Sequence, residues 1–438
     1  PTVLLVVVAS FACAAPPDWP AVEREAVGLL QECVRIDTSN PPGDVSRVVA
    51  LLERALARDG IATKRYVADA KRGHVNLLAR LPGRGAGKPL LMLAHTDVVP
   101  VVPSRWKLPP FSGTIKDGEL WGRGAIDMKG LGIIELTAMR LLKRAGVVPA
   151  RDLLLLFDCD EEIGGDDGAK WMTERHYADL DPAVVLDEGS SGSLGIYTAD
   201  GRTVFGVSVE EKKVLWLKLV AKGESGHGSM PGPHNAVESL VRIAARVPAL
   251  QPAPRDTPVL AAMRKSLGTL ADNPVTRSLA RTTVTVTSLR AGVGDPPKVN
   301  VIPGIAEATI DCRLLPEDSA SAMIAAVRGL LDDPAVTLEV IHAPADVTPL
   351  PYDTPFYRAI VETVSAFVPS ALTVPVILAG GTDARFFRAH GVPAYGFEPM
   401  VRTPEEEELM HGDDERIRLS EFARGIRMEL HLLETFLR

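Results

Sequence analysis

The sequence predicts an α/β protein with a largely parallel sheet flanked by helices and a smaller α+β domain inserted into it. Two observations predict this fold class. In segments 20–211 and 346–438, continuously apolar strands alternate with helical patterns, as in a sheet covered on both faces. In segment 212–345, apolar and polar residues alternate one by one, as in an antiparallel sheet with one exposed face. A chain of 438 residues is also long for a single core, which favours two domains.

The larger domain begins with two helical patterns and then alternates strands with helices. Apolar residues recur with helical spacing over 19–36 and 45–59, so both segments are expected to be helices. Three buried strands are expected next, at 90–94, 153–157 and 183–186. A helix is expected between the first two strands, at 128–145. The same alternation resumes in the C-terminal segment and ends in a long helix. Strands in this order form a largely parallel sheet.

The inserted domain is expected to hold four antiparallel strands and two helices on one face. The alternating strands lie at 213–222, 283–292, 307–315 and 336–341. The two helical patterns start at Asn235 and Ser319. Such a module has one face covered by helices and one face open.

The N-terminal segment and the composition indicate the compartment and exclude one class of partner. Residues 1–15 are mostly apolar and end in small residues, like the hydrophobic and cleavage regions of a secretory signal. We therefore expect a secreted or periplasmic protein, or a cytoplasmic one if this segment is instead a buried strand. The segment is too short to span a bilayer, and no transmembrane helix is expected. A net charge of −8 and a pI near 5.7 argue against a nucleic-acid partner.

Acidic residues gather where the buried strands end. Strand 90–94 runs into His95, strand 153–157 is followed by acids at 158 and 160–162, and strand 183–186 is followed by two more. Carboxyl ends of parallel strands meet at one edge of a sheet, so these groups should converge there. Buried like charges repel and resist desolvation unless a cation lies between them.

Imidazole and carboxylate groups without a thiolate suit zinc or a similar divalent metal. There are more carboxylates than one ion requires, which suggests two ions about 3.5–4 Å apart with a bridging carboxylate. The expected cofactor is therefore a pair of divalent metal ions, Zn²⁺ first, with Co²⁺ or Mn²⁺ as alternatives.

A set of short motifs carries a family resemblance over nearly the whole chain after residue 20. In order they read HTDVVPV, GRGAIDMKG, DEEIGG, LDEG, GHGSMP, NVIPG followed by DCR, GGTDAR and MHGDDERI. Together they resemble the co-catalytic zinc peptidases and amidohydrolases, a family that includes aminoacylase, carboxypeptidase S, acetylornithine deacetylase, succinyl-diaminopimelate desuccinylase and glutamate carboxypeptidase. The wording is most similar to the aminoacylase and carboxypeptidase S branch.

The resemblance implies a set of metal ligands. His95 and Glu188 would hold one zinc ion, and Glu162 and His411 would hold the other. Asp127 would bridge both ions, and a cis peptide would follow it. Asp187 is the alternative to Glu188 as a ligand, since the two carboxylates are adjacent in the chain.

The resemblance also implies two supporting roles. Asp97 would orient the imidazole of His95. Glu161 would be the general base, taking a proton from a metal-bridging water and passing it to the leaving nitrogen.

The inserted domain would act as a lid and a dimerisation domain. In the family, the histidine equivalent to His227 stabilises the oxyanion, often from the neighbouring subunit, so a homodimer is expected. The family's polar contacts to the substrate correspond to Asn300 and Arg313. The loop that would hold the substrate's carboxylate comprises Gly380, Gly381 and Thr382.

These observations predict a zinc-dependent hydrolase that cleaves an amide bond next to a free carboxylate. The substrate would be an N-acyl amino acid or the C-terminal residue of a short peptide. Two alternatives are a deacylase of an acetylated or succinylated diamino acid and a non-catalytic metal-binding or peptide-binding protein on the same scaffold. Glu161 favours an enzyme, because a binding protein would not need a general base.

Overall fold

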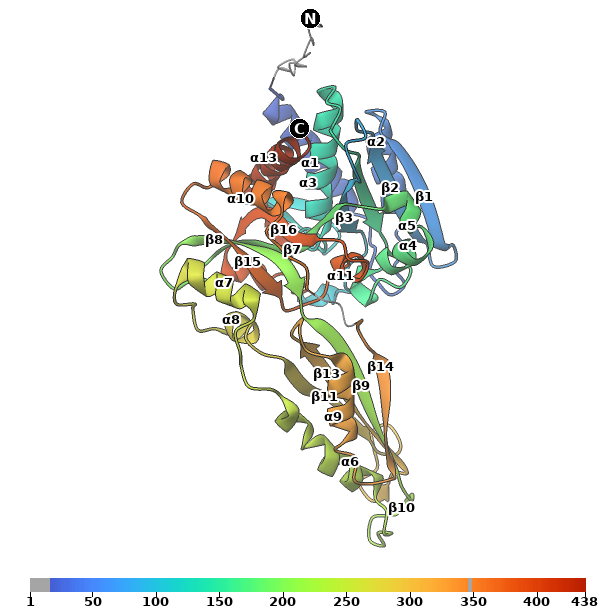
Figure 1. The fold of residues 1–438 in the computed structure, drawn as a ribbon. Coiled ribbons are helices and arrows are strands. Elements are labelled where there is room, and N and C mark those ends of the chain that lie inside the picture. The colour runs from blue at the N-terminus through green and yellow to red at the C-terminus, as the bar shows by residue number, and fades with distance from the viewer. Residues whose placement is uncertain (1–15, 346–348) are drawn as a thin grey trace, which may run out of the picture.

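A computed structural model describes residues 16–345 and 349–438 of the chain. The segment 1–15, predicted to be a signal, lies outside the described residues. Figure 1 shows a larger part, built of a sheet with helices around it, and an elongated smaller part that extends away from it. Within the described ranges, no helix is both long and apolar enough to span a membrane.

The larger part is built on an eight-stranded sheet with the order β1-β2-β6-β3-β7-β16-β8-β15. Its strands are β1 (Ala62–Asp69), β2 (His74–Leu81), β3 (Leu90–His95), β6 (Leu153–Asp158), β7 (Val184–Leu194), β8 (Thr203–Glu211), β15 (Leu372–Leu378) and β16 (Ala394–Arg402). The four neighbours β6, β3, β7 and β16 run parallel, as do β8 and β15. The edge strand β1 and its neighbour β2 are antiparallel additions. The predicted fold class, a largely parallel sheet flanked by helices, is confirmed.

Helices cover both faces of this sheet because its central strands are apolar on both sides. Leu90 and Met92 of β3 face one core, and Leu91 and Leu93 face the other. The first core is covered by α1 (Trp19–Val34), α2 (Ser46–Ala57), α3 (Lys129–Arg144), α10 (Pro355–Phe367) and α13 (Leu419–Phe436). The second is covered by α4 (Ala169–Arg175), α5 (Tyr177–Leu180) and α11 (Ala384–Ala389). Continuous apolar runs in the sequence thus correspond to strands buried on two faces.

The smaller part is a four-stranded antiparallel sheet with the order β11-β13-β9-β14. Its elements are β9 (Lys213–Lys222), α6 (Ala236–Ala244), β11 (Thr283–Ala291), β13 (Ile305–Leu314), α9 (Ala320–Arg328) and β14 (Val336–His342). The two helices pack on one face, where every second residue of β9 and β13 is buried. A two-stranded pair, β10 (Gly226–His227) and β12 (Val301–Ile302), lies at the far end of this module (Figure 1).

Two helices between these strands pack on the larger part. α7 (Pro258–Leu267) and α8 (Pro274–Ser278) follow the proline-rich stretch after residue 250. Leu260 and Met263 of α7 share a core with Val374 and Val376 of β15. Segment 212–345 therefore supplies the strands of the smaller sheet and also a helix that packs on the larger one.

Seven short elements complete the fold. They are η1 (Pro103–Arg105), β4 (Thr114–Lys116), β5 (Glu119–Trp121), η2 (Glu161–Ile163), η3 (Val247–Leu250), α12 (Pro404–Glu407) and β17 (Arg416–Arg418). β17, β5 and β4 form a separate three-stranded sheet. This sheet ties the segment that precedes α3 to the segment that precedes α13.

Two glutamates are buried in the core between α3 and α13. Glu135 and Glu429 are fully buried, and none of their carboxylate oxygens has a hydrogen-bond partner among the residues that the structure describes. Burial raises the pKa of Glu429 to about 8, and burial together with the charge of Glu429 raises the pKa of Glu135. The side chain of Glu429 is therefore mostly protonated in the folded protein at neutral pH.

This burial predicts a pH-dependent stability. The folded state holds the Glu429 proton more tightly than the unfolded state, so the contribution of Glu429 to stability is fully present below the pKa of an unfolded glutamate. That contribution is lost as the pH rises towards 8. Glu429→Gln should match wild type near pH 5 and exceed it at pH 8.5 by up to about 4 kcal/mol in the free energy of unfolding.

Urea unfolding at the two pH values measures this difference. Glu434→Gln on the same helix is the control, because the side chain of Glu434 is 40% exposed. A Glu429→Gln variant that shows the same decline in stability from pH 5 to 8.5 as wild type would contradict the prediction.

Candidate metal centre and active site

Neighbouring parallel strands deliver the first site residues to one edge of the large sheet. His95 is the last residue of β3, and Glu188 lies on β7 beside it. β6, on the other side of β3, runs into η2, which carries Glu161 and Glu162. The backbone of β16 packs closely against the backbone at Glu188. Gly396 of β16 makes this possible, because a side-chain Cβ at this position would lie only 2.4 Å from the Glu188 carbonyl oxygen.

Two further residues reach this edge from loops. Asp127 lies just before α3, and His411 follows α12. The peptide bond between Asp127 and Met128 is cis, as the family resemblance implies. His411 has φ of 59°, in the left-handed region.

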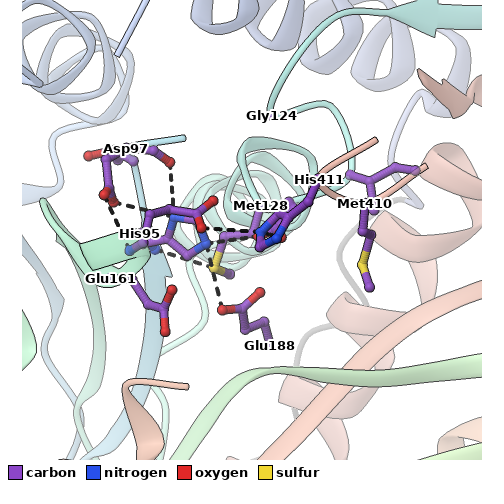
Figure 2. A network of polar contacts seen from close by, with 12 residues as sticks. His95, Asp97, Gly124, Met128, Glu161, Glu188, Met410 and His411 are labelled. Atoms are coloured by element: carbon purple, nitrogen blue, oxygen red, sulfur yellow. Dashed lines mark hydrogen bonds and ion pairs between the residues drawn. The ribbon is translucent and has the colours of Figure 1, made fainter. Parts of the chain in front are cut away.

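Asp127 contacts both histidines. Figure 2 shows His95, Glu188 and His411 gathered in one cluster. The Oδ1 of Asp127 is 3.0 Å from His95 Nε2, and its Oδ2 is 3.0 Å from His411 Nε2. Each histidine has a second carboxylate beside it. His95 Nε2 is 3.6 Å from Glu188 Oε1, and His411 Nε2 is 3.1 Å from Glu162 Oε2. The arrangement is two imidazole–carboxylate sets that share one carboxylate.

The donor chemistry of this cluster fits a pair of divalent cations. The Nδ1 of His95 is 3.0 Å from the main-chain oxygen of Asp97, which accepts a hydrogen bond from it. The Nε2 lone pair then points at the two carboxylates, the tautomer that metal-binding histidines adopt. Burial raises the pKa of Glu188, so removing this carboxylate from water is unfavourable without a compensating positive charge. Nitrogen and oxygen donors without a thiolate suit Zn²⁺, Co²⁺ or Mn²⁺.

Asp97 supports this cluster from behind. Its Oδ1 is 3.5 Å from His95 Nδ1, and its Oδ2 accepts hydrogen bonds from Asn40 Nδ2 at 2.9 Å and from the Glu162 amide at 3.3 Å. It therefore fixes both the ring of His95 and the backbone of η2, which agrees with an orienting role.

The structure brings Glu188 to His95 and turns Asp187 away. The carboxylate of Asp187 accepts hydrogen bonds from the amide of Ala384 at 2.7 Å and from the amide of Glu188 at 2.9 Å. Asp187 thus anchors the start of α11 to β7. The geometry favours Glu188 over Asp187 as the candidate ligand.

Glu161 lies beside the cluster and is held by Arg385. One of its oxygens lies within 4.8 Å of donor atoms of His95 and Glu188. Arg385 Nη1 is 3.4 Å from Glu161 Oε1 and donates to the Thr382 carbonyl at 2.7 Å, and Arg385 Nη2 donates to the Gly164 carbonyl at 2.9 Å. Burial raises the pKa of Glu161, and the positive charges of His95 and Arg385 oppose that rise.

Glu415 supports the site and was not among the predicted residues. This buried carboxylate accepts hydrogen bonds from the amides of Gly124, Ile126 and Asp127, at 3.1, 2.7 and 3.2 Å, and from Arg123 Nη1 at 2.5 Å. It fixes the loop that presents Asp127. The only sequence signal for it is its place in the motif MHGDDERI, four residues after the predicted ligand His411.

The loop that was predicted to bind the substrate's carboxylate lies close to Glu161, and one of its amides donates a hydrogen bond to another residue of the chain. Thr382 is linked to Glu161 through Arg385. However, the Thr382 amide donates to Glu211 Oε2 at 2.6 Å. For Gly380 and Gly381 the structure gives no such bond.

Two of the predicted lid residues, His227 and Asn300, are not brought to the acids within one chain. His227 belongs to β10 and is adjacent to Asn300, since the Gly228 amide donates to the Asn300 carbonyl at 2.8 Å. Both lie at the tip of the four-stranded module (Figure 1). His227 is exposed, and its Nδ1 is 2.8 Å from the Ser229 hydroxyl. Arg313 is on β13, where its Nε donates to Asp311 at 3.0 Å.

The fold and this cluster of paired histidines and carboxylates define a class of metal-dependent amide hydrolases. Residues 91–435 match the model of peptidase family M20/M25/M40. The chain belongs to this family, and it is a hydrolase.

Relatives with assigned names match most of the chain. Aminoacylase-1 from Homo sapiens is 30% identical over 422 residues, which cover 94% of this chain and 96% of the relative. The N-fatty-acyl-amino acid synthase/hydrolase PM20D1 from Mus musculus is 28% identical over 378 residues, which cover 79% of this chain and 74% of the relative.

Solved structures share the fold. The M20 family metallo-carboxypeptidase Sso-CP2 from Sulfolobus solfataricus superposes with a TM-score of 0.74 at 21% identity, covering 94% of this chain and 99% of that chain. The YXEP protein of Bacillus subtilis, described as a dinuclear metal binding peptidase, has a TM-score of 0.61 at 15% identity, covering 96% of this chain and 100% of that chain.

Proposed function

We propose that this protein is a dinuclear metal amidohydrolase that releases a free amino acid from an N-acyl amino acid. The observation that carries this proposal is the position of Asp127 between His95 and His411, with Glu161 beside His95 and Glu188. Similarity to aminoacylase-1 over 94% of the chain supports an acyl amino acid as substrate. Removal of the C-terminal residue of a short peptide is the second candidate, because the bond and the neighbouring carboxylate are the same.

The candidate ligands divide into two sets that share Asp127. His95 and Glu188 would hold one divalent cation, and Glu162 and His411 would hold the other. Bound there, such ions would polarise the scissile carbonyl and lower the pKa of water. We propose Zn²⁺, with Co²⁺ or Mn²⁺ as substitutes.

In this proposal Glu161 performs the proton transfers. Its carboxylate takes a proton from the water that attacks the carbonyl carbon and then delivers it to the leaving nitrogen. Arg385 positions Glu161 for this role, because the guanidinium is itself fixed by two carbonyl oxygens. Only 13% of the Glu161 side chain is exposed, which limits the access of bulk water to its carboxylate.

The free carboxylate of the substrate would bind at the loop after β15. The amides of Gly380 and Gly381 are the proposed donors, and Thr382 contributes through its link to Arg385. The guanidinium of Arg313 suits a planar carboxylate through the nitrogens that Asp311 leaves free. His227 and Asn300 lie far from these groups in one chain, so we propose that a second copy of the chain supplies them.

One substrate panel tests this function. Purified protein loaded with Zn²⁺ is offered N-acetyl amino acids, dipeptides, and N-acetyl and N-succinyl diamino acids, and amino acid release is measured. N-acetyl amino acids should be hydrolysed best, their carboxamide analogues at least about tenfold more slowly. A chelator should abolish release, and added Zn²⁺ should restore it.

Each other outcome selects an alternative. Preference for dipeptides would indicate a peptidase, and preference for diamino acids a biosynthetic deacylase. Metal binding without turnover on any member would contradict the proposal and favour a binding protein.

A further inference from the structure

The open face of the four-stranded sheet carries an exposed aromatic pair near its root. Leu215 and Leu217 of β9 are buried beneath the helices, so Trp216 between them points to the opposite face. Trp216 is 40% exposed, and its ring centroid lies 5.6 Å from that of His342 on the neighbouring strand. An exposed tryptophan beside an exposed histidine presents apolar ring surface that no element packs against within residues 16–345 and 349–438.

This pair lies at the end of the module that adjoins the catalytic residues. Trp216 is near the start of β9 and His342 ends β14, and both ends point to the larger part (Figure 1). Val214, two residues before Trp216, is 3.6 Å from the position of a Cβ at Gly381. Gly381 belongs to the loop after β15, and the next residue of that loop, Thr382, accepts a hydrogen bond from Arg385, which contacts Glu161.

The pair is rigid and sharply bounded. Trp216 Nε1 donates to Asp311 Oδ1 at 3.1 Å, and Asp311 also accepts from Arg313. Further from the root the same face becomes charged, with Lys218 paired to Glu307 at 2.6 Å. The aromatic surface is therefore confined to the part of the face nearest to the catalytic site. A tryptophan fixed by its polar edge presents its apolar ring without losing further rotational freedom on binding.

We propose that Trp216 and His342 form an aromatic platform that packs against the apolar substituent of the substrate and makes this hydrolase selective for apolar N-acyl amino acids. This inference rests on the proposed function. The apolar substituent is either the acyl chain or the side chain of the amino acid, and the two share one chemistry. The platform is a specificity surface: it touches the substrate away from the scissile bond.

Two substrate series distinguish the two sources. The first varies the acyl group of N-acyl alanine from acetyl to hexanoyl to lauroyl, and the second varies the amino acid of N-acetyl substrates from alanine to leucine to phenylalanine. Trp216→Ala should lower kcat/KM roughly ten- to hundredfold for the long members of one series, mainly through KM, and change N-acetyl alanine by less than about threefold. Trp216→Phe, which keeps an apolar ring, should retain most of the selectivity.

Val340→Ala is the matched control. Val340 lies on the same strand as His342 but pairs with the core residue Leu217, and it is 43% exposed. This variant should behave as wild type in both series. An equal loss on every substrate in Trp216→Ala, including N-acetyl alanine, would overturn the platform, as would no change on any substrate.

A binding measurement separates failure of the platform from failure of the proposed function. N-lauroyl alanine carboxamide, a poorly hydrolysed analogue, is titrated into the metal-loaded protein while tryptophan fluorescence is recorded. The fluorescence should change on titration in wild type, and this change should be absent in Trp216→Phe. That variant retains four of the chain's five tryptophans. An unchanged signal in wild type would overturn the platform, whether or not the protein hydrolyses any substrate.

Discussion

Replacing Glu161 by glutamine should abolish hydrolysis and leave both the fold and the metal content intact. Glutamine has the size of glutamate and keeps an oxygen for the contact from Arg385, so the local structure of η2 is preserved. It cannot accept the proton of the attacking water, and general-base catalysis contributes about 10²–10⁴ in rate. We expect kcat to fall at least about a thousandfold with little change in KM.

Metal analysis decides whether Glu161 is the base or a ligand. Glu161 belongs to one of the candidate metal-binding groups, together with His95 and Glu188. If it acts as the base, Glu161→Gln holds as much metal as wild type after dialysis. If metal is lost in parallel with turnover, the residue is a ligand and its proposed role is wrong. Glu405→Gln, an exposed substitution on α12, is the control for a change of charge near the site.

Much of the large sheet could be predicted because its strands are buried on two faces. The runs that end at Ala94 and Phe157 are apolar at every position, and only a central strand of a covered sheet needs that pattern. Residues that follow such strands share one edge, which is why His95, Glu161 and Glu188 could be placed together without coordinates.

Other features depend on contacts between distant segments, and no local pattern reports them. Glu415 accepts hydrogen bonds from amides of the loop before α3, and it follows Ile126 of that loop by 289 residues in the chain. The helix α7 looks like part of the inserted domain, yet its apolar face packs on β15. Glu211 binds the Thr382 amide where the paired strands β8 and β15 end, although these residues are 171 positions apart in the chain, and its position at the end of an ordinary strand gives no hint of this.

The family motifs identify residues without saying which copy of the chain uses them. GHGSMP places His227 in the catalytic set, but the structure places β10 at the tip of the module. His227 can reach the catalytic site of its own chain only if the module swings through a large angle. It can reach the site of a second copy of the chain without such a motion. These possibilities differ in an observable way.

His227→Ala should lower kcat about 10²–10³-fold, the cost of losing one oxyanion donor, with little effect on KM. His234→Ala, a substitution of another exposed histidine in the same module, should leave kcat unchanged. Size-exclusion chromatography with light scattering should show a dimer for all of these proteins.

Mixing two inactive variants then shows which copy supplies the histidine. When Glu161→Gln and His227→Ala chains are exchanged by mild denaturation and refolding, half of the dimers pair one chain of each kind. In such a dimer the His227→Ala chain keeps Glu161 and receives His227 from its partner, so one of the two sites is complete. Activity should return to roughly a quarter of wild type, as two-fold symmetry requires. If the mixture stays inactive although mixed dimers form, His227 acts within its own chain, and the module must close over its own metal centre to reach it.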